Sequence, residues 1–273
     1  MSSSSISPQP LSAPNPVSRI AIFTHGRPET IEAALDRTRK SAQAAGVAVV
    51  ESCTEDPDVV IALGGDGTML RALRAALGTR APVFGVKYGR VGFLTSADGA
   101  HLDEALDRVF SGDYRVVELC TLAAGASGRH VAVNDVVVTS SQPGRMVELG
   151  WKIGGEDLGS QPCDGMICCT PSGSTAYNLS NGGPVMMWGL EAMAMTFVAP
   201  HSLHARPIVV PRGLELAVTN RSSELELTVL VDGHAVGELT AGDSLAVEIG
   251  DERSQLAVLP EVTFFSRYRE VFP

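Results

Sequence analysis

The sequence predicts two dissimilar domains, an α/β domain followed by a mainly β domain. In the first half, short apolar runs alternate with segments of helical periodicity, which favours a parallel, Rossmann-like sheet. In the second half, apolar runs are separated by Gly, Asp and Asn turns, which is typical of strands joined by tight connections. A chain of 273 residues can form two domains, and we expect them at 18–118 and 119–255.

The first domain is expected to open with a buried strand at residues 20–23 and a helix that starts near Pro28. Gly46 follows this helical pattern and is typical of the position just after a helix. Further apolar runs and helical patterns continue the alternation. The expected strands are 47–50, 59–63 and 83–86, and the expected helices are 69–77 and 101–110.

The second domain is expected to be built from strands at 131–138, 146–153, 166–170, 225–231 and 245–249. The C-terminal segment, 256–273, mixes aromatic and basic residues, and we expect it to return to the first domain. Residues 1–17 are mostly Ser and Pro and predict a disordered tail without a secretory signal. The longest apolar stretch, 184–200, contains Glu191 and is short for a membrane span, so we expect no membrane partner.

Charge and cysteine content exclude further classes. The formal net charge of −10 leaves no broad basic surface, so we expect no nucleic-acid partner and only a local anion site. The five cysteines include no CxxC pair and no companion His at zinc spacing. We interpret them as reduced, buried thiols of a cytoplasmic protein, with metal binding as the alternative, and predict no metal site.

The most informative motif is GGDGT, which lies between a buried apolar run and a helical pattern. Gly64, Gly65 and Gly67 lack the Cβ atoms that would keep an anion away, and the turn can aim N–H groups at phosphate, so we expect these glycines and Thr68 to form a phosphate loop. Asp66 would repel phosphate unless a metal intervenes or the carboxylate accepts a proton from an attacking hydroxyl. Both alternatives indicate phosphoryl transfer. The remaining interpretation is an Asp-Gly turn with Thr68 as an N-cap.

Two further segments place polar residues beside apolar runs. Asn134 and Asp135 interrupt VAVNDVVV, and burying them without partners costs on the order of 2 to 7 kcal/mol for a neutral group and more for a charge. They therefore face something polar at a bulge or strand end, or form a plain turn between two strands.

The segment TPSGSTAYNLSNGGP also follows an apolar run. Its hydroxyls at Ser172, Ser174, Thr175 and Ser180 suit bonds to sugar or phosphate oxygens, and Tyr177 could pack on a base. The alternative is a capped helix followed by a glycine turn.

The order of these motifs resembles that of the NAD kinases. The resemblance covers residues 19–250 and is carried by GGDGTML, GRVGFLT, ND at 134–135, CDG at 163–165, TPSGSTAYNLS and PHSLHARPIVVP. GGDG alone is shared with diacylglycerol kinase, sphingosine kinase and phosphofructokinase relatives. The resemblance implies a homodimer or homotetramer with a Rossmann-like domain, a C-terminal β-sandwich and the dinucleotide between them. The implied reaction makes NADP from NAD with ATP, or also polyphosphate, and Mg²⁺ or another divalent cation.

The resemblance also implies roles for individual residues. Asp66 matches the catalytic aspartate that accepts the proton of the adenosine ribose 2′-hydroxyl, and Gly67 lies beside it against the substrate. Asn134 and Asp135 match a pair that holds the adenosine portion. The other implied substrate-binding residues are Arg71, Arg145, Asp164, Thr175, Ala176, Tyr177, Asn178, Leu179, Ser180 and His234.

Four positions depart from the family pattern. Asp135 replaces Glu, Lys87 stands where Asn is common, His234 replaces a common Gln, and Pro162 removes a side-chain contact. His234 is alternatively just the residue after a hairpin turn. Two other functions remain open on the sequence alone. One is a lipid kinase that shares GGDGT, and the other is a catalytically weak dinucleotide sensor.

Overall fold

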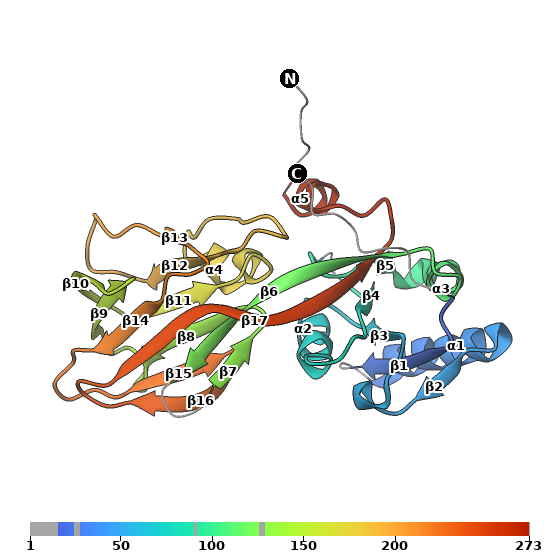
Figure 1. Ribbon diagram of the computed structural model, residues 1–273, viewed down its shortest axis with the longest axis horizontal. Helices are drawn as coiled ribbons and strands as arrows, with labels where there is room; N and C mark the ends of the chain where they lie inside the picture. Colours follow the sequence, from blue (N-terminus) through green and yellow to red (C-terminus); the bar gives the residue numbers. More distant parts are fainter. Residues whose placement is uncertain (1–15, 25–27, 90–91, 126–128, 273) are drawn as a thin grey trace, which may run out of the picture. The chain divides into compact units, whose positions relative to one another are not determined.

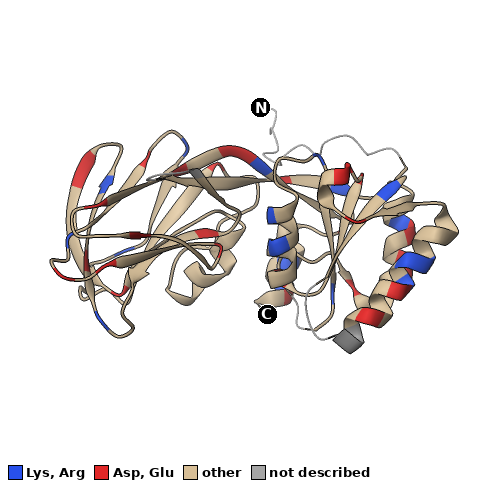
Figure 2. Cartoon of the chain, turned by 90° about the horizontal axis from the view of Figure 1, so that it is seen from below, with Lys and Arg blue, Asp and Glu red and all other residues tan. Residues whose placement is uncertain are grey.

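The computed structural model describes residues 16–24, 28–89, 92–125 and 129–272. The chain forms two compact units, which we call unit 1 (Met1–Glu118 with Ser254–Pro273) and unit 2 (Leu119–Arg253). Most of the tail predicted at 1–17 lies outside the described residues. Val17 is described and buried, and its N–H donates to the carbonyl of Phe110 at 3.0 Å, so the tail prediction is wrong at that residue. Figure 2 shows acidic and basic residues interspersed over both units.

Unit 1 contains a parallel sheet with the strand order β2-β1-β3-β4 (Figure 1). The last residues of β17 pair with β4 in parallel, and β5 also pairs with β4. The predicted Rossmann-like α/β domain is confirmed. The strands are β1 (Arg19–Thr24), β2 (Ala48–Val50), β3 (Val59–Leu63), β4 (Val83–Lys87), β5 (Ala97–Asp98) and β17 (Ser244–Val258).

The helices of unit 1 are α1 (Pro28–Ala45), α2 (Asp66–Ala75), α3 (Leu102–Phe110) and α5 (Phe264–Val271). Gly46 follows α1 with φ of 70°, a left-handed conformation that glycine adopts without strain, so the predicted helix end is confirmed. Arg37 of α1 forms a 2.8 Å ion pair with Asp103 of α3, which ties these two helices together.

Unit 2 is built from two antiparallel layers. The first contains β6 (Arg115–Gly125), β7 (Arg129–Ala132), β9 (Val147–Ile153), β10 (Glu156–Cys163), β14 (Leu216–Asn220) and the first part of β17. The second has the order β13-β12-β11-β8-β15-β16. These strands are β8 (Asp135–Ser140), β11 (Gly165–Cys169), β12 (Ala192–Val198), β13 (Ile208–Pro211), β15 (Leu227–Val231) and β16 (His234–Leu239).

Both layers of unit 2 contribute to one buried core. Leu149 and Val218 from the first layer belong to the same apolar cluster as Met166 and Val229 from the second. In the second layer the alternate residues are buried as well, because Val137, Ile167 and Cys169 belong to a second apolar cluster on the other face of this sheet. The predicted C-terminal β-sandwich is therefore confirmed.

Several expected element limits change. The expected strand at 131–138 is broken into β7 and β8, the expected strand at 245–249 extends to β17, and α2 begins at Asp66 instead of residue 69. The apolar stretch 184–200 contains β12, which is buried inside the sandwich. Among the described helices, none combines the length and apolar character needed to cross a membrane.

Candidate active site

The GGDGT motif forms a tight turn from β3 into α2. The N–H of Gly64 donates to the carbonyl of Val86 at 2.9 Å, which fixes the turn to strand β4. Gly65 is the N-cap of α2, and its carbonyl accepts the N–H of Thr68 at 2.9 Å. Thr68 is thus a buried residue of the first helical turn, and its interpretation as the N-cap is wrong. The turn combines the carboxyl edge of a parallel sheet with a helix N-terminus, an arrangement that favours anions.

The outer side of this turn is open at Gly65 and Gly67. Apart from the adjoining residues and the backbone of the helix itself, no atom in the described part of the chain lies within 4 Å of a Cβ built on either residue. Packing inside unit 1 therefore does not demand glycine at these positions, whereas close approach of a ligand to the backbone would. Arg71 lies further along α2 and is exposed.

The carboxylate of Asp66 is half-buried and held by two backbone groups. The N–H of Phe93 donates to Oδ2 at 2.8 Å, and the N–H of Leu94 donates to Oδ1 at 3.1 Å. Burial raises the pKa of Asp66 above its ordinary value, while these two N–H groups and the charge of Arg267 act in the opposite direction. Asp66 is thus an oriented carboxylate with a greater proton affinity than a free aspartate.

The segment that holds Asp66 depends on Gly92. A Cβ on Gly92 would overlap the carboxyl group of Asp66, so only glycine lets residues 92–94 approach this closely. The ring of Phe93 packs on two rings of the C-terminal segment, with centroid distances of 5.9 Å to Phe264 and 5.7 Å to Phe272. The C-terminal helix α5 therefore covers the segment that orients Asp66.

In unit 2 the strand pairing is interrupted between β7 and β8, a break that comprises Val133 and Asn134 and is followed by Asp135, the first residue of β8. The side chains of Asn134 and Asp135 are both buried, and the break is held by the buried carboxylate of Asp232. The backbone N–H groups of residues 133, 134 and 135 donate to it at 3.0, 2.7 and 3.2 Å. Burial and the neighbouring Asp232 raise the pKa of Asp135 to about 7. Of the two sequence interpretations, the strand end that faces polar groups fits this break better than a plain exposed turn.

The turn that follows β11 packs directly on this break. The hydroxyls of Thr170 and Ser172 donate to the carbonyl of Val133 at 2.6 and 3.0 Å. A Cβ on Gly173 would overlap the carbonyl of Asn134, so glycine is required for the contact. The two motifs that the sequence places 35 or more residues apart thus form one structure.

Part of the predicted run 172–180 serves this turn itself. The hydroxyl of Ser174 accepts the N–H of Met186 at 2.9 Å, and Ser172 is also buried, so the expectation that these two hydroxyls face a ligand is wrong. The amide of Asn178 donates to the carbonyl of Pro184 at 3.1 Å and accepts from Thr196 at 2.7 Å. Asn178 is completely buried and shapes the turn. The residues of the run that remain at least partly accessible are Thr175, Ala176, Tyr177, Leu179 and Ser180.

The predicted substrate-binding residues of unit 2 fall into two groups at opposite ends of β8. Asp135 begins β8 and pairs with Cys169, next to the turn just described, and the hairpin turn at Asp232 also joins this end. His234 follows that hairpin turn, and its Nδ1 lies 2.9 Å from the carbonyl of Asp232. Asp164 lies at the other end, where its carbonyl accepts the hydroxyl of Thr139 at 2.9 Å.

Arg145 belongs to the group of Asp164. Strand β9 begins at Val147 and strand β10 ends at Cys163, and these two residues pair with each other at this end. Arg145 and Pro162 line a shared exposed hollow with residues 221–225. One copy of unit 2 therefore does not bring Arg145 and Asp164 together with Asn134 and Asp135.

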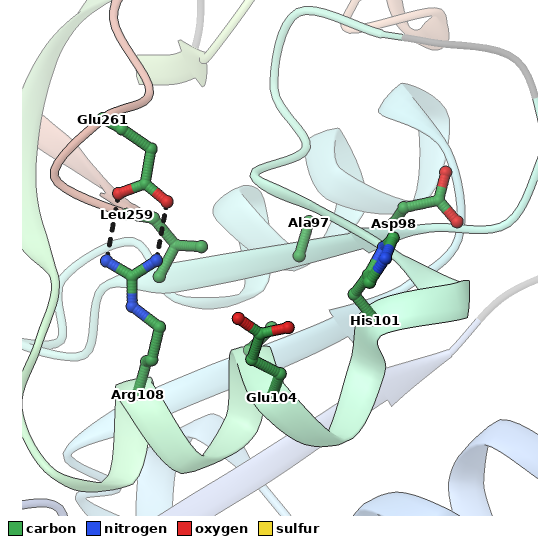
Figure 3. Close-up of a pocket in the computed structure, with 8 residues that line it drawn as sticks. Ala97, Asp98, His101, Glu104, Arg108, Leu259 and Glu261 are labelled. Atoms are coloured by element: carbon green, nitrogen blue, oxygen red, sulfur yellow. Dashed lines mark hydrogen bonds and ion pairs between the residues drawn. The ribbon is translucent and has the colours of Figure 1, made fainter.

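A separate cavity of about 210 Å³ in unit 1 is lined by β5, α3 and the segment before α5. Figure 3 shows the guanidinium of Arg108 facing the carboxylate of Glu261 across two hydrogen bonds, of 2.6 and 3.0 Å. The side chain of Arg115 also donates a hydrogen bond to the carbonyl of Val262, in the segment between β17 and α5. These contacts attach the C-terminal segment to the rest of unit 1.

Sequence reasoning missed three contributors to these sites. Gly92 was inside the motif GRVGFLT but had no assigned role, although a glycine beside a recognised motif is a usable signal. Asp232 was visible only as part of an Asp-Gly turn. Arg267 is one of two basic residues in an aromatic segment, and nothing local distinguishes it from Arg269.

Comparison with known proteins identifies the class and then the family. The family described as ATP-NAD kinase N-terminal domain matches residues 23–114, and the one described as ATP-NAD kinase C-terminal domain matches residues 133–259. The NAD kinase of Gemmatimonas aurantiaca is 39% identical over 80% of this chain and 79% of its own length. That of Heliobacterium modesticaldum is 39% identical over 78% and 77%.

Two solved structures are also similar. An NAD kinase from Archaeoglobus fulgidus in complex with ATP has a TM-score of 0.78 and 25% identity, covering 92% of this chain and 99% of its own. Yeast NADH kinase complexed with NADH has a TM-score of 0.80 at 23% identity, covering 94% and 88%. The fold and the glycine-rich turn define a two-domain phosphotransferase class. The chain belongs to the NAD kinase family.

Proposed function

We propose that this protein is an NAD kinase, which transfers the terminal phosphoryl group of ATP to the 2′-hydroxyl of the adenosine ribose of NAD. The observation that carries the proposal is Asp66, a half-buried carboxylate held by two N–H groups inside a glycine-rich turn. Membership of the NAD kinase family supports NAD as the acceptor. The ATP in the related archaeal structure supports ATP as the donor.

The chemistry follows from the position of Asp66. The ribose 2′-oxygen forms a bond to the γ-phosphorus while the bond from phosphorus to the bridging oxygen breaks, which releases ADP. The hydroxyl proton passes to the carboxylate of Asp66. Because a carboxylate is a weak base, Asp66 acts mainly by orienting the hydroxyl and accepting its proton late. The N–H groups of the glycine turn stabilise the negative charge on the transferred group.

The break at 134–135 is proposed to bind the adenosine portion. The Oδ1 of Asn134 is buried and, among the described residues, has no hydrogen-bond partner, which suits an acceptor for a ligand hydroxyl or amine. With a pKa of about 7, Asp135 is in part a neutral acid near pH 7 and can donate a hydrogen bond to a substrate oxygen. The accessible Tyr177 can pack on the base.

A homodimer or homotetramer is part of the proposal. The two groups of predicted residues are separated by the length of β8, whose six residues span roughly 17 Å. A second copy that supplies Arg145 and Asp164 would complete a site that one copy leaves divided. Light scattering at several concentrations measures the assembly, and a strictly monomeric active enzyme would contradict this part.

Two finer points belong to the same proposal. The divalent cation enters with the donor phosphates, since Mg²⁺ prefers phosphates, waters and one or two carboxylates as ligands. All five cysteines are buried free thiols, which supports the cytoplasm as the compartment.

The test uses purified full-length protein with NAD, ATP and Mg²⁺, and detects the product with an NADP-specific dehydrogenase. We expect NADP to form in proportion to enzyme and time, and to be lost on chelation of the cation. NAD binding without product would instead indicate a sensor. Phosphorylation of a lipid in liposomes without NADP formation would indicate a lipid kinase. Replacing ATP by polyphosphate, and NAD by NADH, defines the range of substrates.

A further inference from the structure

A pair of cations lies beside the GGDGT turn in unit 1. Lys87 is the last residue of β4, and its neighbour Val86 pairs with Leu63 and accepts the N–H of Gly64. The side chain of Lys87 therefore starts from the same sheet edge as the turn. Arg267 comes from α5, and one carboxylate, that of Glu270, contacts both cations.

The two cations are more buried than their counter-ions. The side chains of Lys87 and Arg267 are 12% and 8% exposed, whereas those of Glu270 and Asp98 are 40% and 50% exposed. The Nζ of Lys87 lies 3.4 Å from Glu270 and 3.6 Å from Asp98, longer than the roughly 2.7–2.9 Å of strong charged hydrogen bonds. Arg267 makes one short bond, 2.6 Å from Nη1 to Glu270.

Arg267 has unused bonding capacity. Its Nε is buried, and within the residues that the structure describes it has no acceptor. A guanidinium offers donors in a planar fork that matches two oxygens of one phosphate, and a buried unused donor costs stability. The single carboxylate of Glu270 therefore satisfies only part of the hydrogen-bonding capacity of the two cations.

The position of Arg267 relative to Asp66 is fixed by aromatic packing. Helix α5 contacts Phe93 through Phe264, and the N–H of Phe93 donates to Asp66. Burial raises the pKa of Asp66, and the positive charge of Arg267 is close enough to oppose this rise. The cation pair thus lies on the α5 side of the residue that is proposed to accept the proton.

We propose that Lys87 and Arg267 bind the terminal phosphates of the phosphoryl donor, and that Glu270 is the counter-ion which those phosphates displace. A di- or trianionic phosphate replaces the carboxylate between two preformed cations and supplies the acceptor that Nε lacks. The inference rests on the proposed kinase function and extends it to residues outside the GGDGT motif.

The first test compares the KM for ATP with the KM for NAD in three variants. We expect Lys87→Met and Arg267→Gln to raise the KM for ATP about fivefold or more, with the KM for NAD within about twofold. Glu270→Gln should lower the KM for ATP, because the competing carboxylate is gone. If the ion cluster were purely structural, the KM for ATP would not change in opposite directions on loss of the cations and on loss of Glu270. Arg37→Gln breaks an exposed ion pair of the same unit and serves as the matched control.

A second measurement does not need turnover. Inorganic triphosphate is titrated by calorimetry into the wild type and the variants, each checked for an unchanged melting temperature. We expect the Kd to rise about fivefold or more in Lys87→Met and to fall in Glu270→Gln. Repeating the titration with polyphosphate in place of triphosphate distinguishes a general phosphate site from one specific for ATP.

The outcomes separate the two proposals. Wild type that binds triphosphate through Lys87 but forms no NADP would contradict the kinase function and retain this site. Unchanged triphosphate Kd and unchanged KM for ATP in Lys87→Met and Arg267→Gln, both folded, would overturn the site. Equal increases in the KM for ATP and for NAD would overturn it as well.

Discussion

Asp66 in unit 1 and Asp135 in unit 2 are both enclosed by protein, but their counter-charges differ. Asp66 accepts two backbone N–H groups and feels the positive charge of Arg267. Asp135 has a second acid, Asp232, beside it. The carboxylate of Asp232 accepts the N–H groups of residues 133–135. Burial raises the pKa of both groups, and only at Asp66 do donors and a cation oppose it.

The difference indicates two uses of the same side chain. A carboxylate held by donors stays oriented, and the raised pKa of Asp66 gives it a greater proton affinity, which suits the acceptance of a proton. A carboxyl group next to another acid becomes protonated near neutral pH, which suits donation of a hydrogen bond to a ligand oxygen. The difference fits the proposal that unit 1 carries the chemical step and unit 2 recognises the adenosine portion.

The largest expected effect is at Asp66. Asp66→Asn keeps an oxygen that accepts from Phe93 or Leu94 but removes the proton acceptor, so turnover should fall about 10²- to 10⁴-fold. Binding of NAD, measured by calorimetry, and the melting temperature should change little. Turnover close to that of the wild type would remove Asp66 from the chemistry and break the comparison.

The next effect concerns the pH dependence of stability. The folded-state pKa of Asp135, about 7, lies above its ordinary value, so the native state binds the extra proton and stability falls as pH rises towards 7. The slope for one proton is at most about 1.4 kcal/mol per pH unit.

Asp135→Asn should remove this fall in stability with rising pH. The variant should be more stable than the wild type by on the order of 2–4 kcal/mol at pH 8 and nearly equal to it at pH 4. Urea unfolding at a series of pH values measures both curves. Parallel curves over this range would show that Asp135 is ionised throughout.

Asp232→Asn should have a smaller effect with the opposite sign. The N–H groups of residues 133–135 lose an anionic acceptor, which lowers the free energy of unfolding by about 2 kcal/mol. Asparagine tolerates the left-handed backbone at this position, where φ is 48°, so strain is not added. Combining the change with Asp135→Asn should be less than additive, because the acid pair no longer exists.

The smallest effect is expected at Gly92. The Cβ of Gly92→Ala displaces the carboxylate of Asp66, and a shift of this kind should lower kcat about tenfold. Gly237→Ala is the matched control, since no described atom lies within 4 Å of its built Cβ. An unchanged kcat in Gly92→Ala, with a normal melting temperature, would show that the position of Asp66 tolerates this displacement.

Local patterns were sufficient for much of unit 1. Helix α1 ends just before Gly46 as expected, and β3 covers the expected residues 59–63, because helical periodicity, buried apolar runs and turn glycines are encoded in neighbouring residues. The strand expected across Asn134 failed for the opposite reason. The backbone leaves the strand at Asn134 because the carboxylate of Asp232, 98 residues further along the chain, accepts the N–H of Asn134.

The turn that follows β11 shows the same limit. Its hydroxyls were visible in the sequence, but Ser172 and Ser174 bond to backbone groups brought to them by the fold. A hydroxyl suits a ligand and an internal carbonyl equally well, so only the three-dimensional neighbours distinguish the two uses.

The sequence by itself determined the α/β and β halves, the glycine-rich turn and Asp66 as its acid, since each depends on residues close in the chain. Only the tertiary structure decided what surrounds Asp66, which acid is paired at Asp135, and that Arg267 and Lys87 share Glu270. The physical reason is that charges, hydrogen bonds and burial act through space. Partners separated by up to 183 residues in the chain meet only after folding.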